Sequence, residues 1–158
     1  MVEDNLTVQK LAGLWAADYS EEKTDYDLHW NRVVEGYLFR AGGKGYYECY
    51  LLDGEEFVGA QAAREEGKGS FHYLISGNTV TVTMDRSSEK RVMTYSKGSL
   101  SSLKRVAFQK ATAAQQTLVE QLYGEWQKGN SVLVGDTATI WTDVVDDYTD
   151  EPARSRQR

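Results

Sequence analysis

Two histidines and one cysteine are the side chains in this sequence with the most reactive chemistry. A histidine acts as a base or a metal ligand only when partner groups are assembled around it. Neither His29 nor His72 has the closely spaced Cys, His and carboxylate set that marks a metal site. His72 alternates with Phe71 and Tyr73, which predicts that it faces solvent. Cys49 has no such context either, and we expect a small, inward, apolar residue there.

Two other motifs imitate binding sites. The acidic run at Asp143, Asp146, Asp147, Asp150 and Glu151 lacks the alternate spacing and central glycine of a calcium loop. The stretch 42–45, Gly-Gly-Lys-Gly, imitates a phosphate loop, but no helix follows it, so a hairpin turn is expected. We predict no catalytic residue, no metal ligand and no cofactor. The enzymatic alternative, a barrel mouth with His72 or a carboxylate pair, is not favoured by any spacing.

The composition narrows the class of protein. The chain has 158 residues, 41% of them apolar, which is enough to build the core of one domain. Fourteen Gly, one Pro, ten Tyr and four Trp favour strands and tight turns. A net charge of −6 argues against binding to nucleic acid, which requires clustered Lys and Arg. The class indicated is all-β.

The targeting signals are few. No stretch approaches the roughly 20 apolar residues of a membrane span. The first ten residues, MVEDNLTVQK, are acidic and polar where a signal peptide is basic and then apolar. A chain from which a signal had been removed would look the same, and the single cysteine indicates no compartment, so the localisation stays open.

Alternation of apolar and polar residues predicts the strands. A short helix is expected at residues 5–12, with Asn5 as its N-cap, and strands from Trp15 onward. Glycine-containing turns at 42–45, 53–54, 67–69, 77–78 and 97–98 separate them. In the strand 46–51 the face without Glu48 is expected to point inward. Thr112 is expected to cap a second helix at 113–122.

An internal repeat links the two ends of the chain. Shifting the sequence by 111 positions gives nine identities over the 27 positions 11–37, against about two expected from average residue usage. The pairs include Trp15 with Trp126 and Trp30 with Trp141. The predicted organisation is a β-barrel at 1–110, a helix and a partial repeat of the domain start at 111–148, and a disordered tail at 149–158. The repeated strands are expected to pack on the barrel, pair with another chain or stay poorly ordered, with an interface preferred.

The order of the motifs resembles a known family. Gly13-Leu-Trp15 follows a short helix, residues 36–39 (Gly-Tyr-Leu-Phe) precede the glycine turn, and residues 71–82 run Phe-His-Tyr-Leu-Ile-Ser-Gly-Asn-Thr-Val-Thr-Val. This pattern, from residue 6 to about 108, resembles the bacterial lipocalin-like proteins. The resemblance implies an up-and-down antiparallel β-barrel of about eight strands, with an interior that is filled or holds one small ligand. It also implies a cell-envelope or secreted location, which the missing export signal does not support.

Two functions follow from these expectations. The first is a non-catalytic lipocalin-like protein that binds a small hydrophobic ligand, with Phe39, Tyr47, Tyr73 and Val82 as candidate pocket residues and barrel filling as their alternative role. Trp15 is expected in the core at the closed end of the barrel. The second is an interaction protein with a filled barrel that forms a homo-oligomer through its partial repeat. Both are analogies from the fold.

Overall fold

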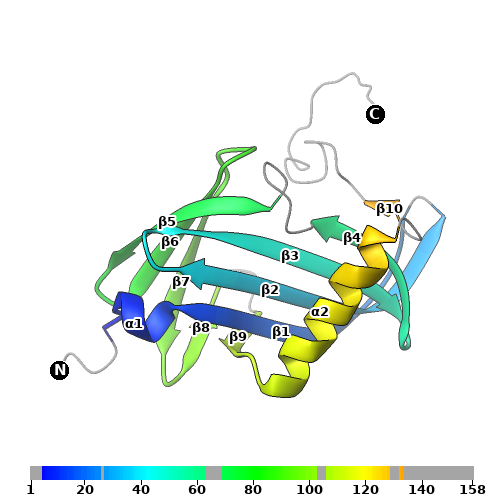
Figure 1. Ribbon diagram of the computed structural model, residues 1–158, viewed down its shortest axis with the longest axis horizontal. Helices are drawn as coiled ribbons and strands as arrows, with labels where there is room; N and C mark the ends of the chain where they lie inside the picture. Colours follow the sequence, from blue (N-terminus) through cyan, green and yellow to red (C-terminus); the bar gives the residue numbers. More distant parts are fainter. Residues whose placement is uncertain (1–4, 26, 63–68, 103–105, 129–131, 134–158) are drawn as a thin grey trace.

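The computed structural model describes residues 5–25, 27–62, 69–102, 106–128 and 132–133. Ten strands and two helices occur in this part of the chain (Figure 1). The elements are α1 Val8–Leu11, β1 Gly13–Asp25, β2 Leu28–Arg40, β3 Lys44–Asp53, β4 Glu56–Ala62, β5 Ser70–Ser76, β6 Thr79–Met84, β7 Lys90–Ser96, β8 Ser99–Ser101, β9 Ala107–Lys110, α2 Ala113–Gln127 and β10 Val132–Leu133.

Eight antiparallel strands close into a barrel. The ring runs β1–β2–β3–β5–β6–β7–β8–β9 and closes where β9 pairs with β1. β3 pairs with β2 along one edge and with two strands along the other: its first residues, 44–46, pair with β5, and its second half pairs with β4. β4 therefore lies outside the ring, with β10 parallel on its far edge. The expected fold class, an antiparallel barrel with a C-terminal helix, is confirmed.

Helix α1 covers one end of the barrel. Leu6 and Leu11 are buried, and the Trp15 indole Nε1–H donates to the Leu11 carbonyl at 2.8 Å. The Leu6 N–H donates to the carbonyl of Gly77, in the turn between β5 and β6, at 2.9 Å. Trp15 is 2% exposed and belongs to the barrel core, as predicted. The barrel is therefore closed at the end that carries the 77–78 turn.

The N-cap expected at Asn5 is wrong. Helix α1 begins at Val8, and Thr7 is its cap, because the Thr7 hydroxyl accepts a hydrogen bond from the Lys10 N–H at 3.1 Å. Leu6 must reach the barrel end to pair with Gly77, which keeps the preceding residues out of the helix. The inward positions Leu6 and Leu11 are confirmed.

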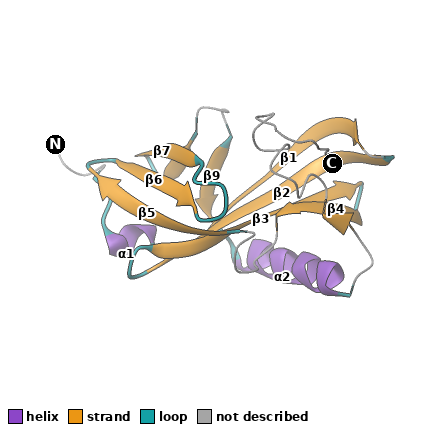
Figure 2. Cartoon of the chain, turned by 90° about the horizontal axis from the view of Figure 1, so that it is seen from above, coloured by secondary structure: helices purple, strands orange, loops and turns teal. Residues whose placement is uncertain are grey.

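Both faces of β3 are buried. Tyr47, Cys49 and Leu51 point into the barrel core, as the alternation predicted. Glu48 and Tyr50, on the other face, are 1% and 0% exposed. Helix α2 lies along this outer face, beneath β3 and β4 (Figure 2). The Tyr50 hydroxyl donates to Glu48 Oε1 at 2.5 Å, so the buried carboxylate has a hydrogen-bond donor beside it.

A second apolar cluster joins α2 to the sheet. Val119 and Leu122 are buried against the outer faces of β2, β3 and β4, and Trp126 is half-buried beside them. Thr112 caps the helix as predicted, in a capping box with Gln115. The Thr112 cap determines where α2 starts. The apolar stripe of α2 determines which face of the helix is buried.

Helix α2 is longer than the sequence predicted. It continues to Gln127, so Gly124 and Trp126 are helical, although the repeat predicts that they open a strand as Gly13 and Trp15 do. Gly13 has φ +117° and begins β1, whereas Gly124 continues the helix. The apolar surface of β2–β4 offers Leu122 and Trp126 a site to pack on, which favours the helical state.

Gly124→Ala is expected to stabilise the protein. A Cβ at Gly124 would meet no atom within 4 Å, and alanine is about 1 kcal/mol more favourable than glycine inside a helix. Urea unfolding followed by circular dichroism should show a higher midpoint by about 0.5–1 kcal/mol of stability. A lower midpoint would mean that residue 124 leaves the helical state in solution.

The repeated positions are mostly core positions of the first copy. Leu11, Trp15, Trp30, Val33, Val34 and Tyr37 are all at most 4% exposed. The second copy beyond Leu133, and the tail at 149–158, lie outside the described residues. The division at 110–111 and the origin of the repeat therefore stay predictions. Neither described helix is long and apolar enough to span a membrane.

Candidate functional site

All four predicted pocket residues lie in the barrel interior. Phe39 lies beside Tyr73, with ring centroids 5.2 Å apart, and Tyr37 links Phe39 to Tyr47 at 6.2 and 4.7 Å. Val82 pairs with Tyr73 across β5 and β6. All four predicted residues are at most 5% exposed in the barrel core. Their inward position is confirmed, whereas their role in binding stays a prediction.

Aromatic rings occupy the middle of the barrel. Phe71 lies 5.4 Å from Phe39, and Phe108 lies 5.0 Å from Tyr37. Such tilted and edge-on pairs add about 0.5–1.5 kcal/mol each beyond the burial of their area. The rings come from β2, β3, β5 and β9, so they tie opposite walls of the barrel together. The middle of the barrel is thus apolar and largely filled by these rings.

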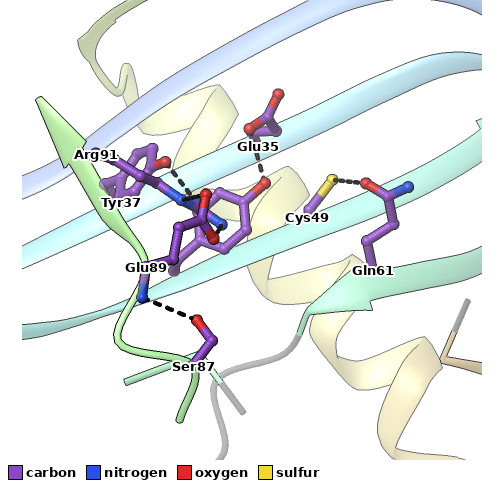
Figure 3. Close-up of polar contacts among 8 residues, drawn as sticks. Glu35, Tyr37, Cys49, Gln61, Ser87, Glu89 and Arg91 are labelled. Atoms are coloured by element: carbon purple, nitrogen blue, oxygen red, sulfur yellow. Dashed lines mark hydrogen bonds and ion pairs between the residues drawn. The ribbon is translucent and has the colours of Figure 1, made fainter. Parts of the chain in front are cut away.

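A group of polar side chains lies at the barrel end opposite α1. β6 has the 77–78 turn at one end and the 85–89 turn at the other, and the polar group lies beside the second turn. Glu35, labelled in Figure 3, is central to it. Its carboxylate accepts hydrogen bonds from the hydroxyls of Tyr19 and Tyr47, the latter at 2.8 Å. We call Tyr19, Glu35 and Tyr47 the Glu35 triad.

Arg91 completes the polar group. Its guanidinium pairs with both carboxylate oxygens of Glu89, at 3.2 and 3.1 Å, and donates to the Tyr37 hydroxyl at 2.7 Å (Figure 3). It also lies 4.5 Å from the centre of the Tyr47 ring. The charge of Arg91 is thus balanced by Glu89, and its guanidinium contacts two of the interior tyrosines, Tyr37 and Tyr47. This arrangement joins β7 to β2 and β3 across the barrel.

Burial raises the pKa of three tyrosine hydroxyls and of the cysteine thiol at this end of the barrel. Burial, followed by the charge of Glu35, raises the pKa of Tyr19. Burial raises the pKa of Tyr37 to about 12, although Arg91 opposes the shift. Burial, with the charges of Glu35 and its neighbours, also holds the pKa of Tyr47 and Cys49 well above the ordinary values. At neutral pH these groups are protonated and able to donate hydrogen bonds.

The protein is expected to lose stability in alkali. A tyrosine in the unfolded chain ionises near pH 10, whereas Tyr37 in the barrel ionises at about 12. The stabilising contribution of the neutral Tyr37 is complete below pH 10 and is lost as the pH rises to about 12. Tyrosinate absorbance and circular dichroism, recorded together, should show the last tyrosines ionising as the strands unfold. Ionisation of all ten tyrosines near pH 10 with intact strands would contradict this.

The two histidines lie on the surface, away from the polar group, whereas Cys49 lies beside the Glu35 triad. His72 is 56% exposed and contacts Asp85 at 2.9 Å, so its predicted solvent position is confirmed. His29 is 43% exposed and contacts Glu22 at 2.8 Å on the β1–β2 hairpin. The Cys49 thiol is buried and donates to the Gln61 side chain at 3.6 Å. Among the described residues no group of three metal-binding side chains occurs.

The Glu35 triad is absent from the sequence prediction. Alternation along β2 places Glu35 on the same face as Val33 and Tyr37, and this was the available signal. The role of Glu35 depends on Tyr19 and Tyr47, which lie 16 and 12 positions away in the sequence. Arg91 is still less accessible to sequence reasoning, because its partner Tyr37 is 54 positions away.

Comparison of the chain with family models, with curated proteins and with solved structures finds no match in any of the three. The class of protein therefore follows from the fold and the site alone. It is a closed antiparallel β-barrel with an aromatic interior, one end covered by a helix and a polar group at the other.

Proposed function

We propose that this chain is a non-catalytic, lipocalin-like binding protein whose barrel takes one small apolar molecule. The observation that carries the proposal is the continuity of the aromatic interior with the polar group at one end. Small barrels of this size hold side chains or one small ligand, and a few polar groups then fix its orientation. Glu35 and Tyr19 are half-buried, so this end of the barrel is partly exposed to solvent, whereas α1 covers the opposite end.

A neutral fluorescent probe tests this proposal. N-phenyl-1-naphthylamine should bind the full chain with one saturable, blue-shifted site. Val82→Phe places a larger side chain beside Tyr73 and should weaken probe binding several-fold, provided that circular dichroism shows the strands intact. Absence of saturable binding would contradict the proposal.

A control variant separates interior binding from surface binding. Leu74 and Val92 are the most exposed large aliphatic residues of the described strands, at 75% and 49%, and they lie on the outer face of the barrel on either side of Thr81. Leu74→Ser should leave the affinity for the probe unchanged. Loss of probe binding in this variant would place the probe on the outer face.

The second candidate function is self-association through the partial repeat. The observation that favours it is β10, which lies in the repeat and adds a parallel strand to the edge of β4. The same addition between two chains would join them edge to edge. Sedimentation should then show a dimer that Val132→Pro dissociates, because proline removes a backbone donor from β10. A monomer at all concentrations would exclude this function.

A further inference from the structure

We infer that the ligand carries a protonated amine at its polar end, and that Glu35 selects it. This inference rests on the proposed binding function and specifies the chemistry of the same site. It concerns the charge of the ligand, which aromatic barrel walls alone do not determine.

Glu35 has hydrogen-bond donors but no cation. Both groups that donate to its carboxylate are neutral tyrosine hydroxyls, and within the described part of the chain it forms no ion pair. A half-buried carboxylate without a cationic partner attracts a positive charge more strongly than the same group in water, because the local dielectric constant is lower. A ligand amine would complete this pairing.

Arg91 is already engaged. Three of its nitrogen atoms donate to Glu89 and Tyr37, and its charge is balanced by the Glu89 carboxylate. A ligand carboxylate would have to displace Glu89 from Arg91, or approach the Glu35 carboxylate with no cation to balance the two negative charges. Both routes leave a carboxylate unpaired in a partly buried site, which is costly. The polar end therefore disfavours anions.

The hydroxyls of the Glu35 triad suit an ammonium group. Tyr19 and Tyr47 each donate a hydrogen to Glu35, and a phenol oxygen can also accept a hydrogen bond. An ammonium has three N–H donors, which the carboxylate oxygens of Glu35 and the Tyr19 oxygen can accept. The negative charges of Glu35 and Glu21 also contribute to the raised pKa of both Tyr19 and Cys49, consistent with a negative potential at this end.

Three ligands of equal chain length test the inference. Octylamine, octanol and octanoate are titrated against the full chain loaded with N-phenyl-1-naphthylamine at neutral pH. Octylamine should displace the probe at about a tenfold lower concentration than octanol, the ratio expected for one charge-assisted hydrogen bond, and octanoate should be the weakest. Equal displacement by all three would overturn the inference and leave the binding function intact. Failure of the probe itself to bind would contradict the function, and the inference with it.

Variants then assign the selectivity to Glu35. Glu35→Gln keeps the shape and an acceptor but removes the charge, so octylamine should lose its tenfold advantage while octanol is unaffected. Glu22→Gln makes the same change of charge at an exposed carboxylate, 72% exposed, and should preserve the advantage. Should Glu35→Gln fail to fold, Tyr19→Phe removes one phenol oxygen and is expected to weaken octylamine several-fold relative to octanol. If a folded Glu35→Gln or Tyr19→Phe variant still prefers octylamine over octanol as strongly as the parent protein does, the inference is overturned.

Discussion

Gly45→Ala is expected to be among the most damaging single-methyl additions to this barrel. Gly45 lies where β3 begins, between Phe39 on β2 and Phe71 on β5. A Cβ there would lie 2.0 Å from the Leu38 carbonyl oxygen and 2.7 Å from the Phe71 ring. The backbone oxygen cannot rotate away, so β2 and β3 must separate. We expect a loss of about 3 kcal/mol or more, at the upper end of overpacking costs.

Thermal and urea unfolding of Gly45→Ala measure this loss directly. Gly54→Ala is the matched control, because a Cβ at Gly54 meets no atom within 4 Å and only its φ of +66° is unfavourable. That backbone strain costs about 1–2 kcal/mol. Equal losses in the two variants would contradict the close approach of β2, β3 and Phe71.

Phe39→Ala is expected to cost about 3–5 kcal/mol and to leave a cavity in the aromatic interior. Phe39 is 1% exposed, and its ring contacts those of Tyr37, Phe71 and Tyr73. An apolar cavity of this kind stays dry and accepts a small aromatic molecule. Benzene should therefore raise the melting temperature of the variant in a concentration-dependent way, and by more than it raises that of the parent protein.

The control for this variant is an exposed aliphatic residue. Leu74→Ala should change stability by no more than about 0.5 kcal/mol, because Leu74 is 75% exposed. A loss of less than about 1 kcal/mol in Phe39→Ala, or no effect of benzene on it, would mean that the interior collapses around the missing ring.

The barrel strands could be predicted because their signals are local. Val80, Val82 and Met84 alternate with threonines, and turns occur at the glycine-containing positions 53–54, 77–78 and 97–98. Strand bounds and inward faces therefore follow from neighbouring residues. The inward position of Tyr47 and Cys49 follows from the same rule. Burial of Glu48 does not, because it depends on α2, which comes more than 60 positions later.

The state of residues 122–127 shows where sequence similarity and tertiary packing diverge. The repeat makes Gly124 and Trp126 equivalent to Gly13 and Trp15. Gly13 and Trp15 lie in β1, which pairs with β2 and β9. In the second pair, the helix started by Thr112 continues because Leu122 and Trp126 pack on the sheet. Local pattern predicted the helix start correctly, whereas its end depends on a surface formed by distant strands.

The polar group at the end of the barrel could not be predicted from the sequence. Glu35 and Arg91 read as ordinary charged residues in their strands, and only barrel closure brings Arg91 to Tyr37 and Glu35 to Tyr19 and Tyr47. The Glu35 side chain could be placed on the inner face by alternation along β2. Which groups surround it depends on the register of β1, β2 and β3.

The most direct measurement of ligand position is amide chemical-shift mapping by NMR with octylamine added to the full chain. We predict that the largest shifts occur at Glu35, Tyr47 and Cys49, with smaller ones at Phe39. Shifts confined to α2 around Val119 and Leu122, or to the outer face at Leu74 and Val92, would place binding outside the barrel and contradict an interior site.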